Sequence, residues 1–247
     1  MSETKTRGGK TVFGASLGIL MLETQFPRIP GDIGHASTWP FPVHYRVVRG
    51  ATPDNVVRGD PKRQLQTFID AGQQLVDMGC DGIATNCGFL SLLQEDLSQA
   101  LGVPVATSAL MQAPMIQATL PPPRHVSILT ISEKTLTPEH LQAAGVPHGT
   151  PVMGTDGGNT FTQHILGDAL EIDFEACRAD MRTAAQRLVS EHPKTGAILL
   201  ECTNMVPYAA EIRATVGLPV YSIYTFLTWF QGALLPRRFP HELVDWR

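Results

Sequence analysis

Two cysteines lie in similar polar segments and are the best candidates for chemistry in this chain. Residues 85–89 read Thr-Asn-Cys-Gly-Phe and residues 201–205 read Glu-Cys-Thr-Asn-Met, so the thiols are Cys87 and Cys202. A thiolate can remove a proton from carbon while an opposing thiol returns one to the other face. The pair therefore suits inversion of a stereocentre beside a carboxylate or carbonyl, through a planar carbanion that nearby donors must stabilise.

The segments around the two cysteines recur at an offset of 115 residues. Gly-Ile-Ala-Thr-Asn-Cys at 82–87 corresponds to Ala-Ile-Leu-Leu-Glu-Cys at 197–202, and Leu-Gly-Val-Pro-Val at 101–105 to Val-Gly-Leu-Pro-Val at 216–220. A long internal period of this kind indicates a repeated structural unit. Here the unit is half of the molecule, which predicts a pseudo-twofold protein.

Apolar runs and helical spacing predict the elements that position the thiols. Residues 17–22, 43–48 and 126–131 are expected to be strands, and residues 65–76 and 174–189 carry apolar positions at helical spacing. Alternating strands and helices predict an α/β fold with parallel sheets in two lobes.

The repeat also predicts how the chain divides between the two lobes. We expect residues 11–108 and 218–247 to form the first lobe, residues 109–217 the second, and residues 1–10 a flexible tail.

Cys87 and Cys202 each end a predicted strand and precede a predicted helix. Ligands of parallel α/β sheets bind at the carboxyl ends of strands, so the two thiols should face one cleft. A helix N-terminus lowers the pKa of a thiol, and we expect that effect at both positions. Cys177 lies on the apolar face of a predicted helix and Cys80 ends a predicted helix beside the Asp81-Gly82 turn, and both are expected to be buried core residues.

Composition excludes several classes of protein. The net charge of −4 gives no footprint for nucleic acid, and four cysteines in 247 residues do not form a secreted disulfide framework. No HxxxH or HExxH motif occurs, and none of the five lysines lies where a pyridoxal Schiff base is expected. We therefore expect a cytoplasmic enzyme that acts on a small molecule, without a metal or a cofactor.

Two uncharged stretches, 97–123 and 214–236, are long enough to cross a bilayer. Both contain prolines and polar residues, which favour a short buried strand followed by a helix. No membrane association is expected.

The T-N-C-G and E-C-T-N segments, together with the first strand and its following loop, resemble the aspartate/glutamate/hydantoin racemase superfamily. The resemblance spans nearly the whole chain. It implies two pseudo-symmetric Rossmann-like lobes, an active site between them, Cys87 and Cys202 as two acid–base groups, no cofactor, and a homodimer or higher homo-oligomer.

The expected substrate-binding residues surround the two thiols or follow the first strand. They are Thr85, Asn86, Gly88, Phe89, Thr203, Asn204, Glu23 and Thr24. Glu201 is a further candidate that could orient or protonate a substrate group.

The expected function is a cofactor-independent racemase or epimerase of an amino acid such as aspartate, or of a hydantoin-like compound. Glutamate racemases carry Asp-Ser-Gly after the first strand, where this chain has Glu23-Thr24-Gln25, and the loop at 27–42 is longer than that pattern needs. Glutamate is therefore a poor candidate. A cis-trans isomerase or decarboxylase of the same superfamily, a cysteine-nucleophile hydrolase with His35, His44 or His164 as base, and a two-lobed binding protein stay open.

Overall fold

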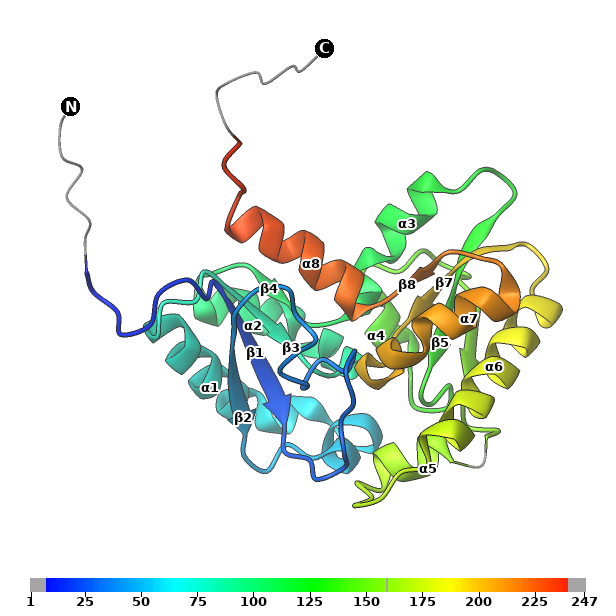
Figure 1. Cartoon of the computed structure of the whole chain (residues 1–247), viewed down its shortest axis with the longest axis horizontal. Coiled ribbons are helices and arrows are strands. Elements are labelled where there is room, and N and C mark those ends of the chain that lie inside the picture. Colours follow the sequence, from blue (N-terminus) through cyan, green and yellow to red (C-terminus); the bar gives the residue numbers. More distant parts are fainter. Residues whose placement is uncertain (1–7, 159, 240–247) are drawn as a thin grey trace, which may run out of the picture.

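Two four-stranded parallel sheets lie side by side in the computed structural model, which describes residues 8–158 and 160–239 (Figure 1). The strand order is β2-β1-β3-β4 in one sheet and β6-β5-β7-β8 in the other, with parallel pairing throughout. The strands are β1 (Leu17–Leu22), β2 (Val43–Val48), β3 (Gly82–Thr85), β4 (Val105–Ala106), β5 (His125–Thr130), β6 (Val152–Gly154), β7 (Thr195–Leu200) and β8 (Val220–Tyr221). The expected α/β fold with two lobes is confirmed.

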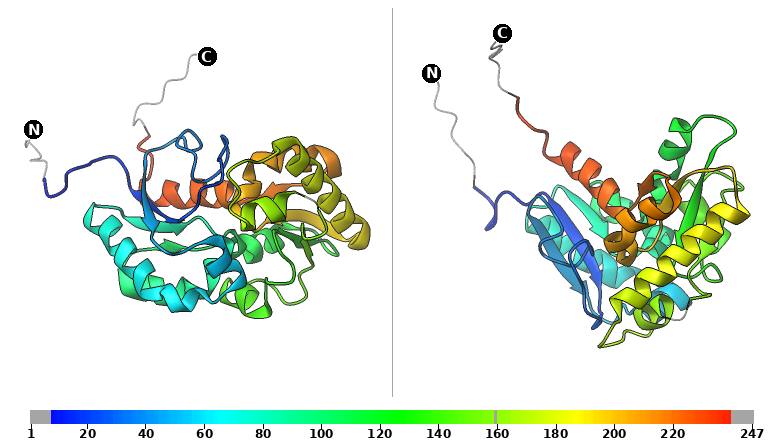
Figure 2. Two further views of the ribbon diagram at one scale, coloured as in Figure 1. Left: turned by 90° about the horizontal axis from the view of Figure 1, so that it is seen from below. Right: turned by 45° about the vertical axis from the view of Figure 1, so that its right-hand side comes forward.

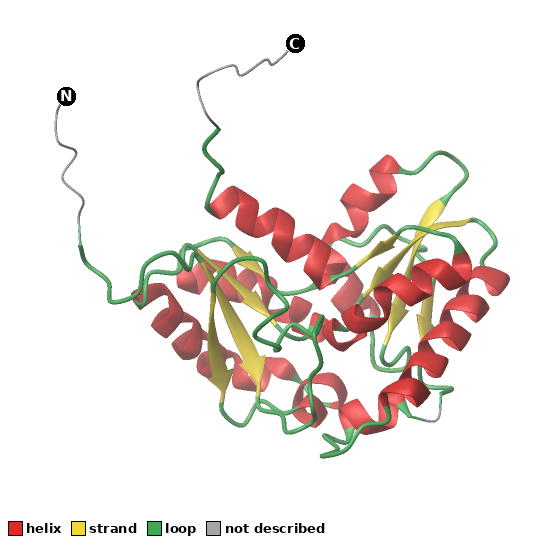
Figure 3. Cartoon of the chain, in the orientation of Figure 1, coloured by secondary structure: helices red, strands yellow, loops and turns green. Residues whose placement is uncertain are grey.

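Helices flank both sheets and bury the central strands on two faces (Figure 3). Such strands read as continuous apolar runs, which is why Leu-Gly-Ile-Leu-Met-Leu in β1 and Ala-Ile-Leu-Leu in β7 were recognisable in the sequence. The helices are α1 (Leu65–Asp77), α2 (Gln94–Leu101), α3 (Ala113–Thr119), α4 (Pro138–Ala143), α5 (Phe161–Leu166), α6 (Phe174–Glu191), α7 (Ala209–Val216) and α8 (Ile223–Leu234).

The sequence repeat corresponds to a repeat of the backbone. The two sheets have the same strand order, and the helices α2 and α7 end in the same way, at Gly102 (φ +64°) and Gly217 (φ +70°). This left-handed conformation ends many helices and is adopted without penalty by glycine, which lacks a Cβ. The pseudo-twofold arrangement predicted from the 115-residue offset is therefore present.

The chain passes between the lobes near its C-terminal end. Strand β8 pairs with β7 in the second sheet, although the sequence analysis placed 218–247 in the first lobe. Helix α8 then returns to the first lobe, where Phe230 and Leu234 lie against Gly82 of β3 (Figure 2). The expected lobe boundaries otherwise stay a prediction, and residues 240–247 lie outside the described residues.

Residues 1–7 of the expected tail lie outside the described residues, whereas Lys10 donates a hydrogen bond to the carbonyl oxygen of Gly79 at 3.0 Å. Each uncharged stretch contains a short strand followed by a helix. These are β4 and α3 in residues 97–123, and β8 and α8 in residues 214–236. Within the described ranges, no helix is long and apolar enough to span a membrane.

Candidate active site

Both candidate thiols line one cavity between the sheets. Cys87 lies two residues beyond β3 and Cys202 two residues beyond β7, and each precedes a short 3-10 helix, Gly88–Leu93 or Thr203–Tyr208. The cavity has an empty volume of about 360 Å³, and the two cysteines are 9% and 7% exposed. The fold thus brings together two groups that are 115 residues apart in the chain.

Residues of both lobes complete the cavity wall. Of the predicted binding residues, Thr24, Asn86, Gly88, Phe89 and Asn204 line it. Phe26, Arg28 and Glu201 add an aromatic ring and two charges, and the remaining wall is apolar, from Leu22, Pro53, Val57, Ile131, Ile165 and Leu166. His35, His44 and His164 are not among the described residues that line the cavity, so the histidine of a cysteine hydrolase is not supplied there.

Three predicted binding residues do not line this cavity. The hydroxyl of Thr85 donates to the carbonyl oxygen of Thr107 at 2.5 Å, and that of Thr203 to the carbonyl oxygen of Asn86 at 2.6 Å. Glu23 lines a neighbouring, wider cavity and pairs with Arg49. Each threonine hydroxyl thus donates to a backbone carbonyl oxygen of another segment, and these hydrogen bonds hold the cysteine-bearing segments in place.

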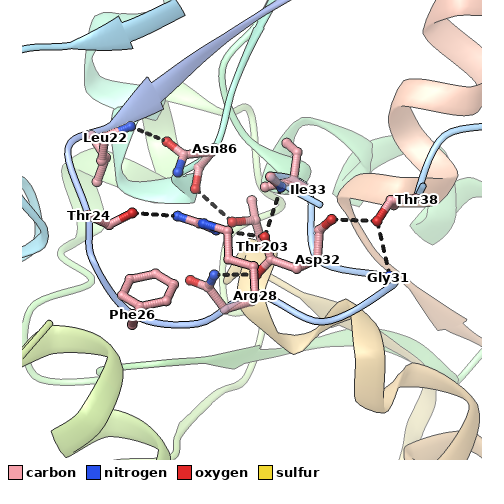
Figure 4. A network of polar contacts seen from close by, with 12 residues as sticks. Leu22, Thr24, Phe26, Arg28, Gly31, Asp32, Ile33, Thr38, Asn86 and Thr203 are labelled. Carbon is pink, nitrogen blue, oxygen red and sulfur yellow. Dashed lines mark hydrogen bonds and ion pairs between the residues drawn. The ribbon is translucent and has the colours of Figure 1, made fainter. Parts of the chain in front are cut away.

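The long loop at 27–42 holds a buried carboxylate, that of Asp32, beside the cavity-lining Arg28 (Figure 4). Oδ1 of Asp32 accepts from Nη1 of Arg28 at 2.6 Å and from the amide of Gly34 at 2.8 Å, while Oδ2 accepts from Nδ2 of Asn204 at 2.6 Å. Asp32 is 4% exposed. The loop that seemed too long for the family pattern therefore orients Arg28 from one lobe and Asn204 from the other.

Arg28 is a site residue that the sequence analysis missed. Its Nη2 donates to Oγ1 of Thr24 at 2.9 Å, and its guanidinium lies over the ring of Phe26 at 4.5 Å (Figure 4). The available signal was the spacing of Arg28 and Asp32, which are four residues apart in a loop with no other charged residue. Sequence alone did not reveal that this pair faces the cysteines.

The expected lowering of the thiol pKa values is wrong. Burial raises the pKa of Cys87 and of Cys202, and the carboxylate of Glu201 raises both further. The amides of Phe89 and Leu90 oppose the shift at Cys87, and the amide of Asn204 does so at Cys202. Loss of water outweighs these few dipoles, so both cysteines are held as neutral thiols.

Glu201, which immediately precedes Cys202, is buried against Gly88 of the other cysteine-bearing segment. Oε2 accepts from Oγ1 of Thr130 at 2.8 Å, whereas Oε1 has no hydrogen-bond partner in the described structure, and the side chain is fully buried. Burial raises the pKa of this carboxyl to about 7, against the lowering effect of Thr130. A Cβ at position 88 would overlap Oε1, which explains why the residue after Cys87 is glycine.

Solved structures with this fold include enzymes of one superfamily. A glycine-to-cysteine mutant of arylmalonate decarboxylase with sulfate matches 92% of this chain and 97% of its own, with TM-score 0.59 and 16% identity. Allantoin racemase from Pseudomonas fluorescens matches 93% of this chain and 100% of its own, with TM-score 0.54 and 15% identity. An aspartate racemase homologue from Pyrococcus horikoshii matches 89% of this chain and 98% of its own, with TM-score 0.56 and 12% identity. The fold is that of the aspartate/glutamate/hydantoin racemase superfamily.

Curated relatives define the family more narrowly, although no family model matches the chain. A dimethylsulfoniopropionate lyase from Durusdinium sp. clade D is 30% identical over 241 residues, which cover 94% of this chain and 79% of the relative. Dimethylsulfoniopropionate lyase 7 from Emiliania huxleyi is 30% identical over 231 residues, which cover 89% of this chain and 67% of the relative. The chain belongs to the dimethylsulfoniopropionate lyase family of enzymes. These relatives are named lyases, whereas the sequence analysis expected an isomerase.

The raised thiol pKa values predict slow alkylation of the free protein. Each unit of pKa above neutrality removes about nine-tenths of the thiolate, which is the reactive form. Cys87 and Cys202 should react with iodoacetamide at pH 7 at least about tenfold more slowly than free cysteine, with a rate that still rises at pH 9. Peptide mass spectrometry gives the rates, with the denatured protein as control. Alkylation at the rate of free cysteine would contradict the prediction.

The buried carboxyl of Glu201 predicts a dependence of stability on pH. Its folded pKa of about 7 exceeds the ordinary value of 4.5, so the folded state binds more protons between these values and loses stability as pH rises through them. The variant E201Q lacks this loss. Its free energy of unfolding relative to wild type should rise by about 3 kcal/mol from pH 4 to pH 8. Urea unfolding at both pH values measures it, and a constant difference would refute it.

Proposed function

We propose that this protein is a lyase that cleaves dimethylsulfoniopropionate into dimethyl sulfide and acrylate. The observation that carries the proposal is the pair of buried thiols in one cavity, in a chain of the dimethylsulfoniopropionate lyase family. In this β-elimination a base takes the proton beside the carboxylate, the C–H electrons form the carbon–carbon double bond, and the C–S bond breaks with its electron pair leaving on sulfur. No oxidant or reductant is required.

A thiolate of the cysteine pair is the proposed base. The neutral thiols gain acidity when the substrate brings its positive sulfonium group into the same water-poor cavity, because a nearby cation favours the charged form of a thiol. Proton removal is therefore coupled to substrate binding. A single base is sufficient for elimination, whereas racemisation uses both thiols in opposite protonation states.

Arg28 and Asn86 are the proposed anchors of the substrate carboxylate. Arg28 lines the cavity and has five N–H donors, of which Asp32 and Thr24 engage one each at Nη1 and Nη2. Oδ1 of Asn86 accepts from the amide of Leu22 at 2.7 Å, so Nδ2 is the group that this side chain offers to a ligand. Donors at the carboxylate also stabilise the negative charge that develops there as the proton leaves.

Removal of the thiols tests the base assignment. In Cys87→Ala and Cys202→Ala, loss of the base should lower kcat for dimethyl sulfide release by about 10²- to 10⁴-fold, and the two losses should be unequal because elimination needs one base. Gas chromatography of dimethyl sulfide measures the rate. Cys80→Ala, which removes a thiol that does not line the cavity, is the matched control. Full activity in both single variants would contradict the proposal.

Replacement of Arg28 tests the carboxylate anchor. Arg28→Met should raise KM for dimethylsulfoniopropionate by about tenfold or more, since a charged hydrogen bond is worth about 1.5–3 kcal/mol. Arg63→Met, at an exposed position away from the cavity, is the control. An unchanged KM in Arg28→Met would place the carboxylate elsewhere.

Racemisation is the second candidate, and the presence of two thiols in one cavity is the observation that favours it. Incubation with enantiopure amino acids or 5-substituted hydantoins in D2O should then exchange the α-hydrogen, and chiral chromatography should detect the opposite enantiomer. Dimethylsulfoniopropionate has no stereocentre, so the two activities are measured independently.

A further inference from the structure

The charges on the cavity wall do not balance. Arg28 and Glu201 are the two charged residues among the described lining residues, and Asp32 already neutralises Arg28 at 2.6 Å. Glu201 has no such cationic partner in the salt bridges of the described structure, and its Oε1 accepts no hydrogen bond there. An unpaired carboxylate buried in this way is costly unless a ligand brings the missing positive charge.

We propose that Glu201 binds the positively charged end of the substrate, so that the site selects carboxylates with a fully alkylated onium group. This inference rests on the proposed function and deepens it by assigning the second end of the substrate. Arg28 and Asn86 then hold the carboxylate, and Glu201 holds the sulfonium.

The repeat places two different polar side chains at equivalent positions. Asn86 and Glu201 are related by the 115-residue offset, and each immediately precedes a cysteine of the cavity. One half thus offers an amide donor, and the other offers a carboxylate. This asymmetry in a pseudo-symmetric frame matches a ligand with an anionic end and a cationic end.

The rest of the wall favours an alkylated cation over an ammonium group. A sulfonium or quaternary ammonium has no N–H group, so it needs charge and apolar contact but no further acceptors. Phe89, Ile165 and Leu166 provide apolar contact, and aromatic rings attract such cations. A primary ammonium carries three donors, whereas Glu201 offers one free oxygen, Oε1. Free amino acids should therefore bind more weakly than methylated onium acids.

Three small carboxylates isolate the effect of the positive charge. They are 3-(trimethylammonio)propanoate, its uncharged carbon isostere 4,4-dimethylpentanoate, and β-alanine. The first two share their shape and differ in charge, and the third has the charge without the methyl groups. Titration calorimetry at pH 8, where Glu201 is ionised, measures the three dissociation constants without requiring turnover.

The wild-type protein should bind the trimethylammonio compound at least about tenfold more tightly than either of the other two, as expected for one buried charge pair. In E201Q the preference over the carbon isostere should fall to about one, while affinity for the isostere itself is unchanged or higher. Glu95→Gln, at an exposed position of α2, is the matched control and should keep the wild-type preference.

The inference is overturned if the wild-type protein does not prefer the trimethylammonio compound over both other compounds, if none of the three compounds binds, or if E201Q keeps the preference over the carbon isostere. If E201Q does not fold, Glu201→Asp keeps the charge and must keep the preference over the carbon isostere. A clear onium preference without release of dimethyl sulfide from dimethylsulfoniopropionate would refute the proposed function and leave the assignment of Glu201 standing.

Discussion

The buried carboxylate of Asp32 joins the two halves of the site, and the geometry of the cavity depends on it. It accepts hydrogen bonds from Arg28 and Gly34 of its own loop and from Asn204 in the 3-10 helix Thr203–Tyr208 of the other lobe. A carboxylate that is 4% exposed must have such partners, because an unsatisfied buried charge is strongly unfavourable. The requirement fixes the loop at 27–42 across the carboxyl ends of the strands.

Other contacts between the lobes follow the same logic. Thr203 donates to the carbonyl oxygen of Asn86, and Asp168, after α5, accepts from the amides of Gln25 and Phe26. Each of these polar groups lies on a segment that bears or covers a cavity residue. The relative position of Cys87 and Cys202 is therefore held by hydrogen bonds at the mouth of the cleft as well as by the apolar cores of the two lobes.

Exclusion of water controls the chemistry of the cavity. It raises the pKa of both thiols and of Glu201, so the cavity holds little reactive thiolate. In the reaction that we propose, a zwitterionic substrate changes this balance because its positive charge enters a cavity whose wall carries the carboxylate of Glu201. On this proposal, reactive thiolate forms in the substrate complex, and the thiols of the free protein stay neutral.

The sequence by itself determined the elements and the repeat. Buried strands such as Leu17–Leu22 are continuous apolar runs, and the 115-residue offset identified Cys87 and Cys202 as equivalent positions. These features are local, or depend on comparison of one half of the chain with the other. The tertiary structure alone decided that Arg28 lines the cavity of the two thiols, that Asp32 holds it there, and that the hydroxyls of Thr85 and Thr203 donate to backbone carbonyl oxygens. It also decided the direction of the thiol pKa shifts, because burial and non-local contacts depend on how the two lobes pack.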